Sequence, residues 1–338
     1  MKKKIITIFQ YTFFFLLGIL FVWLTIKDVN QEQWNNIKLA VANARLWLFI
    51  PVILLLILSH LSRALRWKIL MEPLGYKPST FNTFSAVMIG YLVNAGVPRL
   101  GEVVKCTLLS RYENVRADKL IGTIVVERAF DALCLLIVFI FALWSEGEVI
   151  GEYTKSLFQS FFSDKAGDIS VLRIAIFFIS IVAVITLISF MLKKFGHLDF
   201  IAKIKNVIYG IWLGLNSFRY IKNKMAFLFH TIFIWAMYLL SSAAGIYALK
   251  ETDHLGLGAG LSTLAIGSVG MIITPGGIGA YPWLIEKLMS LYEISASTGK
   301  ALGWLLWSAQ TIIILIVGVI CLALISSYNK NRKKHESN

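Results

Sequence analysis

Charged side chains are scarce in this chain of 338 residues. Only 15% of the residues are Asp, Glu, Lys or Arg, whereas 57% are hydrophobic, and the mean hydropathy is +0.72. A soluble domain carries about a quarter charged residues. The shortage excludes a large soluble domain and predicts an all-α polytopic membrane protein in which residues 1–338 form a single membrane domain.

The chain also lacks the sequence patterns of disulfide frameworks, metal sites and nucleotide-binding loops. The three cysteines are too scattered for a disulfide framework, and no two of the five histidines have metal-ligand spacing. Neither a Walker A sequence nor an HExxH sequence occurs. We therefore expect no metal, no cofactor and no enzymatic activity. The formal charge of +14 lies mostly in short loops and tails, which indicates membrane topology and not a nucleic-acid partner.

Hydrophobic runs long enough to cross a bilayer recur along the chain, and a helix needs roughly 20 apolar residues for this. The predicted full spans are residues 5–26, 46–70, 120–144, 169–192, 225–249 and 302–328. Residues 27–45 are expected to be a polar connection, and residues 193–224 a basic segment with a helix at the membrane surface. Basic residues near both ends, including the tail 329–338, place both termini in the cytoplasm.

Two further apolar stretches are interrupted by proline and glycine. Residues 81–97 stop at Pro-Arg-Leu-Gly-Glu (98–102), and residues 257–273 stop at Thr-Pro-Gly-Gly-Ile-Gly (274–279). Proline removes a backbone donor, and glycine allows backbone angles that other residues avoid. Inside a bilayer such breaks occur where the backbone is buried in protein or lines a wet cavity. They predict two re-entrant helical hairpins.

The distribution of basic residues predicts that the two hairpins enter from opposite sides of the membrane. Residues 1–144 would then form a first repeat, and residues 169–328 a second repeat of opposite orientation. Inverted repeats with broken helices are typical of secondary transporters. A helix of 17 residues spans about 25 Å, nearly a full crossing, so the alternative fold has eight spans.

Charged residues inside the apolar segments cost on the order of 3 kcal/mol each at the bilayer centre, so they face partners or water. Glu127, Arg128 and Asp131 form one such group, in which the two carboxylates share a helix face. Arg63 and Arg66 lie on an earlier span. Two interpretations stay open: an ion-pair network that clamps the spans together, or a relay for a lipid headgroup or a proton.

The first hairpin tip carries side-chain charge. Arg99 follows Pro98, and the next helix is expected to begin near Gly101, with Glu102 and Lys105 in its first turns. An arginine beside a helix N-terminus is suited to bind phosphate. The alternative is a loop arginine that touches lipid headgroups.

The second hairpin tip offers backbone groups. Gly276, Gly277 and Gly279, together with Thr274 and Pro275, would expose amides at the start of a half-helix. The alternative is that these glycines permit tight helix packing. Neither hairpin tip continues into the Lys-Ser/Thr pair that a nucleotide-binding loop requires.

Three motifs carry a resemblance to a known family: Pro-Arg-x-Gly-Glu-x-x-Lys at 98–105, Glu-Arg-x-x-Asp at 127–131 and Thr-Pro-Gly-Gly-Ile-Gly at 274–279. In this order they resemble the flippase-like membrane domain of lysylphosphatidylglycerol synthetases over about residues 5–328, a domain that also exists as stand-alone members in prokaryotes. The resemblance implies movement of a phospholipid or a polyprenyl-phosphate-linked lipid between the leaflets of a prokaryotic cytoplasmic membrane.

Two features depart from that family's pattern. An acidic residue often follows the Pro-Gly-Gly-x-Gly motif after two residues, whereas this chain has Pro282 there and Glu286 about a turn later. The lysyl-transferring relatives also carry a soluble domain after the membrane part. Here about ten polar residues follow the last predicted span, so lysyl transfer is not expected.

The leading hypothesis is a lipid flippase for an anionic or phosphate-bearing lipid. Its candidate substrate-binding residues are Arg99, Glu102, Lys105, Glu127, Arg128, Asp131, Thr274, Gly276, Gly277 and Gly279. The supporting residues are Arg63, Arg66, Pro98, Gly101, Pro275 and Glu286. One alternative is an integral-membrane lipid-phosphate transferase with Glu127 or Asp131 as base. Another is a membrane scaffold for a separate lipid-modifying enzyme.

Overall fold

The computed structural model describes residues 16–27, 29–147 and 220–336. These parts of the chain are helical and contain no strand. The elements, in order, are the helix Leu16–Ile26, α2 (Gln31–Ala42), η1 (Leu46–Leu48), α3 (Phe49–Met71), η2 (Glu72–Leu74), α4 (Thr80–Gly96), α5 (Leu100–Glu113), α6 (Ala117–Ser145), α10 (Lys224–Ile246), α11 (Leu257–Ile273), η4 (Pro275–Gly277), α12 (Ala280–Leu291) and α13 (Ala296–Glu336).

Three stretches are long and apolar enough to cross a membrane: Leu46–Leu74, Lys224–Ile246 and Ala296–Arg332. They coincide with predicted spans, and α6 fills a fourth. An all-helical membrane protein is therefore confirmed, whereas the count of six full spans stays a prediction. The predicted span 169–192 and residues 193–219 of the predicted surface segment lie outside the described residues, as does the first part of the span 5–26.

The predicted polar connection at 27–45 contains a helix that the sequence analysis did not identify, because α2 occupies most of it. Asn30 begins this helix with a capping box: its Oδ1 accepts from the Gln33 amide at 2.8 Å, and the Gln33 side chain accepts from the Asn30 amide at 3.1 Å. Ile37 and Ala40 pack into an apolar cluster with α12 and α13. The short apolar face of α2 is too weak a pattern to identify the helix in advance.

The first broken stretch folds back as two packed helices, α4 and α5. Arg99 adopts a left-handed φ of 66° between them, and the Asn94 side chain accepts from the Gly101 amide at 2.8 Å. Gly90 and Gly101 bring the two helices into backbone contact, since a Cβ on Gly101 would overlap the Gly90 carbonyl oxygen. The break at Pro98–Gly101 was located correctly because proline and glycine mark it directly.

The second broken stretch folds back in the same way as α11 and α12. Gly276, Gly277 and Gly279 have φ values of 59°, 72° and 71°, which other residues rarely adopt. A Cβ on Gly277 would lie 2.5 Å from the Met271 Sδ of α11 and 3.3 Å from the Tyr281 Cβ of α12. Tight packing, the structural alternative for these glycines, is therefore present.

The two breaks meet inside the molecule. A Cβ on Gly276 would lie 3.3 Å from the Cα of Ala95, at the end of α4, and the indole Nε1 of Trp307 donates to the Gly276 carbonyl at 2.8 Å. A Cβ on Gly279 would overlap the backbone of Phe21 and Val22 in the first helix. The second tip is thus enclosed by the first helix, α4 and α13.

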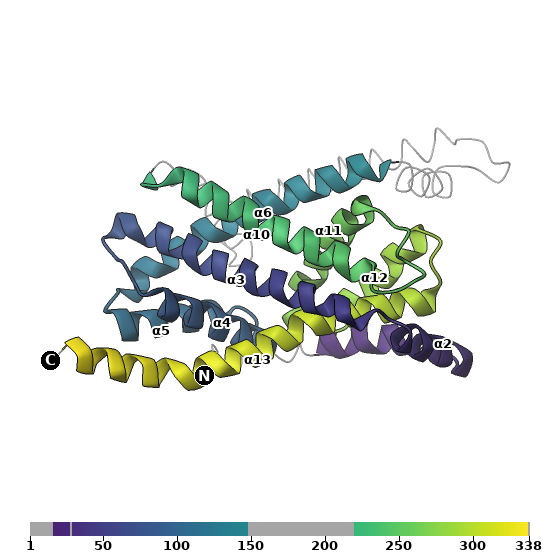
Figure 1. Cartoon of the computed structure of the whole chain (residues 1–338), viewed down its shortest axis with the longest axis horizontal. Helices are drawn as coiled ribbons and strands as arrows, with labels where there is room; N and C mark the ends of the chain where they lie inside the picture. Colours follow the sequence, from purple (N-terminus) through teal and green to yellow (C-terminus); the bar gives the residue numbers. More distant parts are fainter. Residues whose placement is uncertain (1–15, 28, 148–219, 337–338) are drawn as a thin grey trace, which may run out of the picture.

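Figure 1 shows how the two helix pairs are distributed. α3 and α10 pack side by side in the middle, and α13 runs beneath them along the length of the molecule and contacts α2, α12 and α4 (Figure 1). α4 and α5 lie towards one end, α11 and α12 towards the other (Figure 1). This arrangement leaves the region between the two pairs to be filled by α3, α6 and α10.

The close approach of α4 and α5 gives a stability prediction. Gly101→Ala should lower the free energy of unfolding by about 1–3 kcal/mol, because the new methyl group forces the two backbones apart. Gly122→Ala in α6 is the matched control, since a Cβ there meets nothing within 4 Å. Thermal unfolding in detergent, followed by tryptophan fluorescence, measures both. Equal melting temperatures for the two variants would contradict the close approach.

Candidate functional site

Five charged side chains form one ion-pair network in the interior, named here the buried charge cluster. Its members come from three helices, α3, α5 and α6, and they are Arg63, Arg66, Lys105, Glu127 and Asp131. Their side chains are between 0% and 14% exposed. Burying a charge without a partner is strongly unfavourable, so each of these groups depends on the others.

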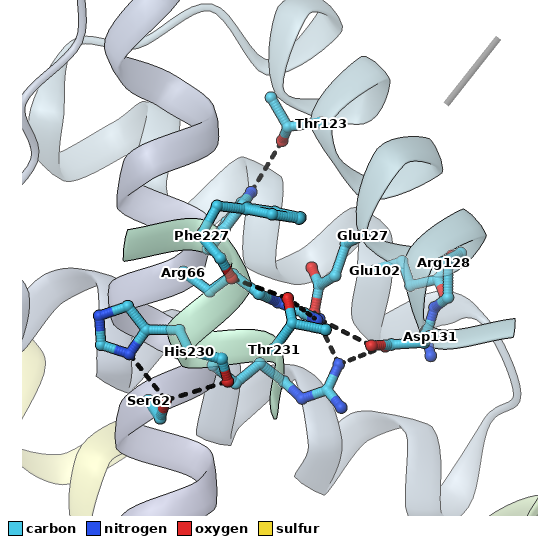
Figure 2. Close-up of polar contacts among 12 residues, drawn as sticks. Ser62, Arg66, Glu102, Thr123, Glu127, Arg128, Asp131, Phe227, His230 and Thr231 are labelled. Carbon is cyan, nitrogen blue, oxygen red and sulfur yellow. Dashed lines mark hydrogen bonds and ion pairs between the residues drawn. The ribbon is translucent and has the colours of Figure 1, made fainter. Parts of the chain in front are cut away.

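α3 and α6 are joined through both carboxylates. Arg63 Nη1 lies 2.9 Å from Glu127 Oε1 and 2.6 Å from Asp131 Oδ2. Arg66 Nη2 lies 2.8 Å from Asp131 Oδ1, and its Nη1 donates to the Thr231 hydroxyl of α10. Figure 2 shows Arg66, Glu127 and Asp131 converging between the helices. The ion-pair network between these spans, one of the two interpretations of these charges, is therefore present.

Lys105 attaches α5 to the same cluster. Its Nζ lies 2.9 Å from Glu127 Oε2 and 4.5 Å from the ring centroid of Trp67. Trp67 is fully buried, and its Nε1 donates to the Thr123 hydroxyl at 2.8 Å. The cation is thus held by a carboxylate and by an aromatic face.

A second ion pair lies next to the cluster in a more exposed position. Arg128 Nη2 is 2.8 Å from Glu102 Oε1, which connects α6 to α5, and the two side chains are 48% and 30% exposed. The two side chains lie beside one another in Figure 2. Because both groups are partly exposed, removing one of them should cost less stability than removing a carboxylate of the buried charge cluster.

A cavity of about 460 Å³ adjoins the cluster. Arg63, Arg128 and Asp131 form its charged wall. Most of the remaining wall comes from α10, α11, the start of α12 and the middle of α13. It includes hydroxyl, amide and aromatic groups as well as aliphatic side chains: Trp235, Tyr238, Ser241, Ser242, Thr263, Leu264, Ser268, Met271, Ile272, Tyr281, Gln310 and Ile314. Its volume lies in the range of small-molecule sites, roughly 300–1,000 Å³.

Several buried polar atoms around the cavity have no hydrogen-bond partner. They are His60 Nδ1, Arg63 Nε, Trp235 Nε1 and Thr263 Oγ1, and all four residues line the cavity. Buried polar groups are nearly always paired, so a cluster of unpaired ones needs an explanation. The sequence analysis missed His60, Trp235 and Thr263. The signal that could have found them is an isolated polar side chain within a long apolar run.

Residues at the two tips lie apart from the buried charge cluster. Arg99 is exposed in the break between α4 and α5 and does not line the cavity, whereas Lys105 turns towards Glu127. The Thr274 hydroxyl donates to the Ile278 carbonyl at 3.0 Å and so supports the second tip. Lys105 thus belongs to the buried charge cluster, whereas the grouping of Arg99 with the amides of the second tip stays a prediction.

Glu286 has a separate environment. It is buried on α12, with Oε1 4.0 Å from Lys300 Nζ of α13 and 3.5 Å from Lys287 Nζ. It does not line the cavity. Among the described residues no group of three or more His, Cys, Asp or Glu could hold a metal ion.

Comparisons with known proteins give one family and one distant relative. The family described as "Lysylphosphatidylglycerol synthase TM region" matches residues 11–318. A UPF0104 membrane protein of Methanocaldococcus jannaschii is 22% identical over 341 residues, which cover 95% of this chain and 96% of that protein. No solved structure matches the chain. The family match includes both broken helix pairs and the buried charge cluster.

The cluster predicts strong coupling between Lys105 and Glu127. Glu127→Gln leaves three buried cations against one carboxylate and should destabilise the protein by about 3–5 kcal/mol. Lys105→Met in the Glu127→Gln background should recover part of that loss, with an interaction free energy of about 0.5–3 kcal/mol. Denaturant unfolding in detergent gives the free energies of unfolding of the wild type, the two single variants and the double variant, which together form a double-mutant cycle. Asp118→Asn, which breaks the exposed pair with Arg116, is the control and should change stability by less than about 1 kcal/mol. Additive effects in the cycle would contradict a shared network.

Proposed function

Since the chain belongs to the family of the lysylphosphatidylglycerol synthase transmembrane region, we propose that it moves a phospholipid or a polyprenyl-phosphate-linked lipid between the two leaflets of its membrane. The proposed location is a prokaryotic cytoplasmic membrane, with both termini in the cytoplasm. The lipid would be anionic or phosphate-bearing. The protein would act as a transporter without a catalytic step of its own.

The single observation that carries the proposal is the cavity beside the buried charge cluster. One wall presents Arg63, Arg128 and Asp131, and the others are polar or apolar. A lipid has the same division, with a charged headgroup and apolar chains. Charged residues at membrane depth are costly and mark substrate or ion pathways. A site of this kind can hold a headgroup while it crosses the apolar layer.

Polar contacts join distant parts of the chain at both ends of the molecule. Near α2, Arg45 Nη2 lies 2.7 Å from Asp253 Oδ2. In the last turns of α13, Asn329 exchanges two amide hydrogen bonds of 2.8 Å with Asn82 of α4. Figure 1 places α2 and the C-terminal end of α13 at opposite ends. In the proposed cycle each set of contacts would open in turn to expose the cavity to one side.

Glu113 strengthens the contact at the α13 end. Its Oε1 lies 2.9 Å from Arg332 Nη1 and accepts from the Ser79 amide. Burial alone would raise the pKa of Glu113, but hydrogen bonds from Asn82, Ser79 and Arg332 hold this pKa below its usual value. A carboxyl with a depressed folded-state pKa stabilises above its unfolded pKa and loses that contribution as the pH falls through the folded pKa. This end should therefore loosen in acid.

A vesicle assay tests transport directly. Purified full-length protein is reconstituted with fluorescently labelled lipids, and the label in the outer leaflet is removed with a membrane-impermeant reductant. We expect the wild type to equilibrate an anionic phospholipid faster than protein-free vesicles. Arg63→Gln should slow this by about tenfold or more, because removing one partner of a buried charge pair costs about 2–5 kcal/mol.

Arg116→Gln, on an exposed ion pair, is the control and should transport at the wild-type rate. Wild-type protein that equilibrates no anionic lipid faster than empty vesicles would reject the proposal. Chemical conversion of the labelled lipid would favour the transferase alternative. Unchanged transport in Arg63→Gln would show that the cavity is not the pathway.

A further inference from the structure

The buried charge cluster is not neutral. Three of its members are basic and two are acidic, so it carries one excess positive charge. The neighbouring Arg128 and Glu102 pair with each other and add no net charge. Among the described residues no other carboxylate lies within 4.0 Å of these three cations. An uncompensated charge in a buried site is costly, which points to an anion that completes the cluster.

Four residues that line the cavity have buried polar atoms without a hydrogen-bond partner. Arg63, whose Nη1 already binds both carboxylates, has an Nε without a partner, and it is 6% exposed. Trp235 Nε1 is a second donor without a partner. Thr263 and His60, which are 0% and 7% exposed, each have one more unpaired atom, and all four residues line the same cavity. An anion with two or more oxygens could accept from several of these groups together.

The cavity opens between α6 and α11. Ala132 on α6 and Ile272 on α11 both line it, and both are exposed, Ile272 to 72%. Arg128 also lines the cavity and is partly exposed, so it lies at the mouth. The most exposed side chain at this opening, Ile272, is apolar, as a surface in contact with lipid would be. Acyl chains could leave through this opening while the headgroup stays inside.

We propose that the cavity selects lipids whose headgroup carries a single negative charge and no positive charge. Such a headgroup, a phosphodiester or a carboxylate, would neutralise the excess charge of the cluster. A zwitterionic or basic headgroup would leave that excess in place. A phosphomonoester, with a charge of about −1.5 to −2 at pH 7, would overcompensate it. The inference rests on the proposed function for its lipid substrate, and it is tested by binding.

The first experiment measures binding to full-length protein in a neutral detergent. The four probes are phosphatidylglycerol, a monoanionic phosphodiester; oleate, a monoanionic carboxylate; phosphatidylcholine, a zwitterion; and phosphatidic acid, a phosphomonoester. A ligand that binds the folded state raises the melting temperature in a concentration-dependent way. Phosphatidylglycerol should bind on the order of tenfold more tightly than phosphatidylcholine or phosphatidic acid. Oleate binding as tight as that of phosphatidylglycerol would show that charge alone is recognised, whereas weaker oleate binding would identify the phosphodiester.

The second experiment shifts the charge of the cluster. Lys105→Gln makes the cluster neutral and should abolish the preference for phosphatidylglycerol over phosphatidylcholine. Asp131→Asn raises the excess to two positive charges and should move the preference towards phosphatidic acid. The double variant Lys105→Gln/Asp131→Asn restores a single excess positive charge. It should regain the preference for phosphatidylglycerol although it has lost two ion-pair partners, an outcome that a purely structural role does not produce.

Equal affinities for phosphatidylglycerol and phosphatidylcholine in the wild type would overturn the inference, whether or not the variants fold. Preferences in folded variants that do not follow the cluster's charge would overturn it as well. The vesicle assay separates this from the proposed function. Selective binding without transport would reject the flippase and leave the charge selection standing. Transport of zwitterionic and anionic lipids at equal rates, without selective binding, would support the flippase and reject the charge selection.

Discussion

Five charged side chains lie in the interior of this membrane protein, and the need to neutralise them constrains the arrangement of the helices around them. Arg63 and Arg66 on α3 meet Glu127 and Asp131 on α6 at N–O distances of 2.6 to 3.7 Å. Lys105 brings α5, and with it the first broken helix pair, to the same point. Removing either carboxylate would leave three buried cations with a single anionic partner.

The two broken helix pairs complete the interior around that cluster. The second tip lies against the end of α4, because Gly276 leaves no room for a side chain beside Ala95. Glycine is needed there both for its positive φ and for this close approach. The breaks therefore position the helices that line the cavity, whereas the charges beside the cavity come from α3 and α6. The two broken helix pairs thus supply the close packing, whereas α3 and α6 supply the charges that line the cavity.

How far the sequence predicts this structure differs between features. Helix ends at the two breaks were predicted to within one or two residues, since Pro98 and the glycines at 276–279 interrupt the helix chemically. The contact of Arg63 with Glu127 and Asp131 was one of two interpretations of these charges, because buried charges in an apolar chain need partners. Both inferences depend on local chemistry.

Other features depend on tertiary packing, which local patterns do not contain. α2 is stabilised by its contacts with α12 and α13. Lys105 could have faced the tip with Arg99, and only the packing of α5 against α6 turns it towards Glu127. His60, Trp235 and Thr263 come from three helices and meet at one cavity. These three residues come together only through the packing of their helices, which the spacing of residues along the sequence does not show.

The central claim is that an anionic lipid completes the buried charge cluster. Native mass spectrometry of the protein, extracted gently from its own membrane, tests this most directly. The account predicts a bound lipid with a single negative charge that is enriched over its share of the membrane, and that is lost in Lys105→Gln. A bound population with the same headgroup composition as the surrounding membrane, in both proteins, would contradict it.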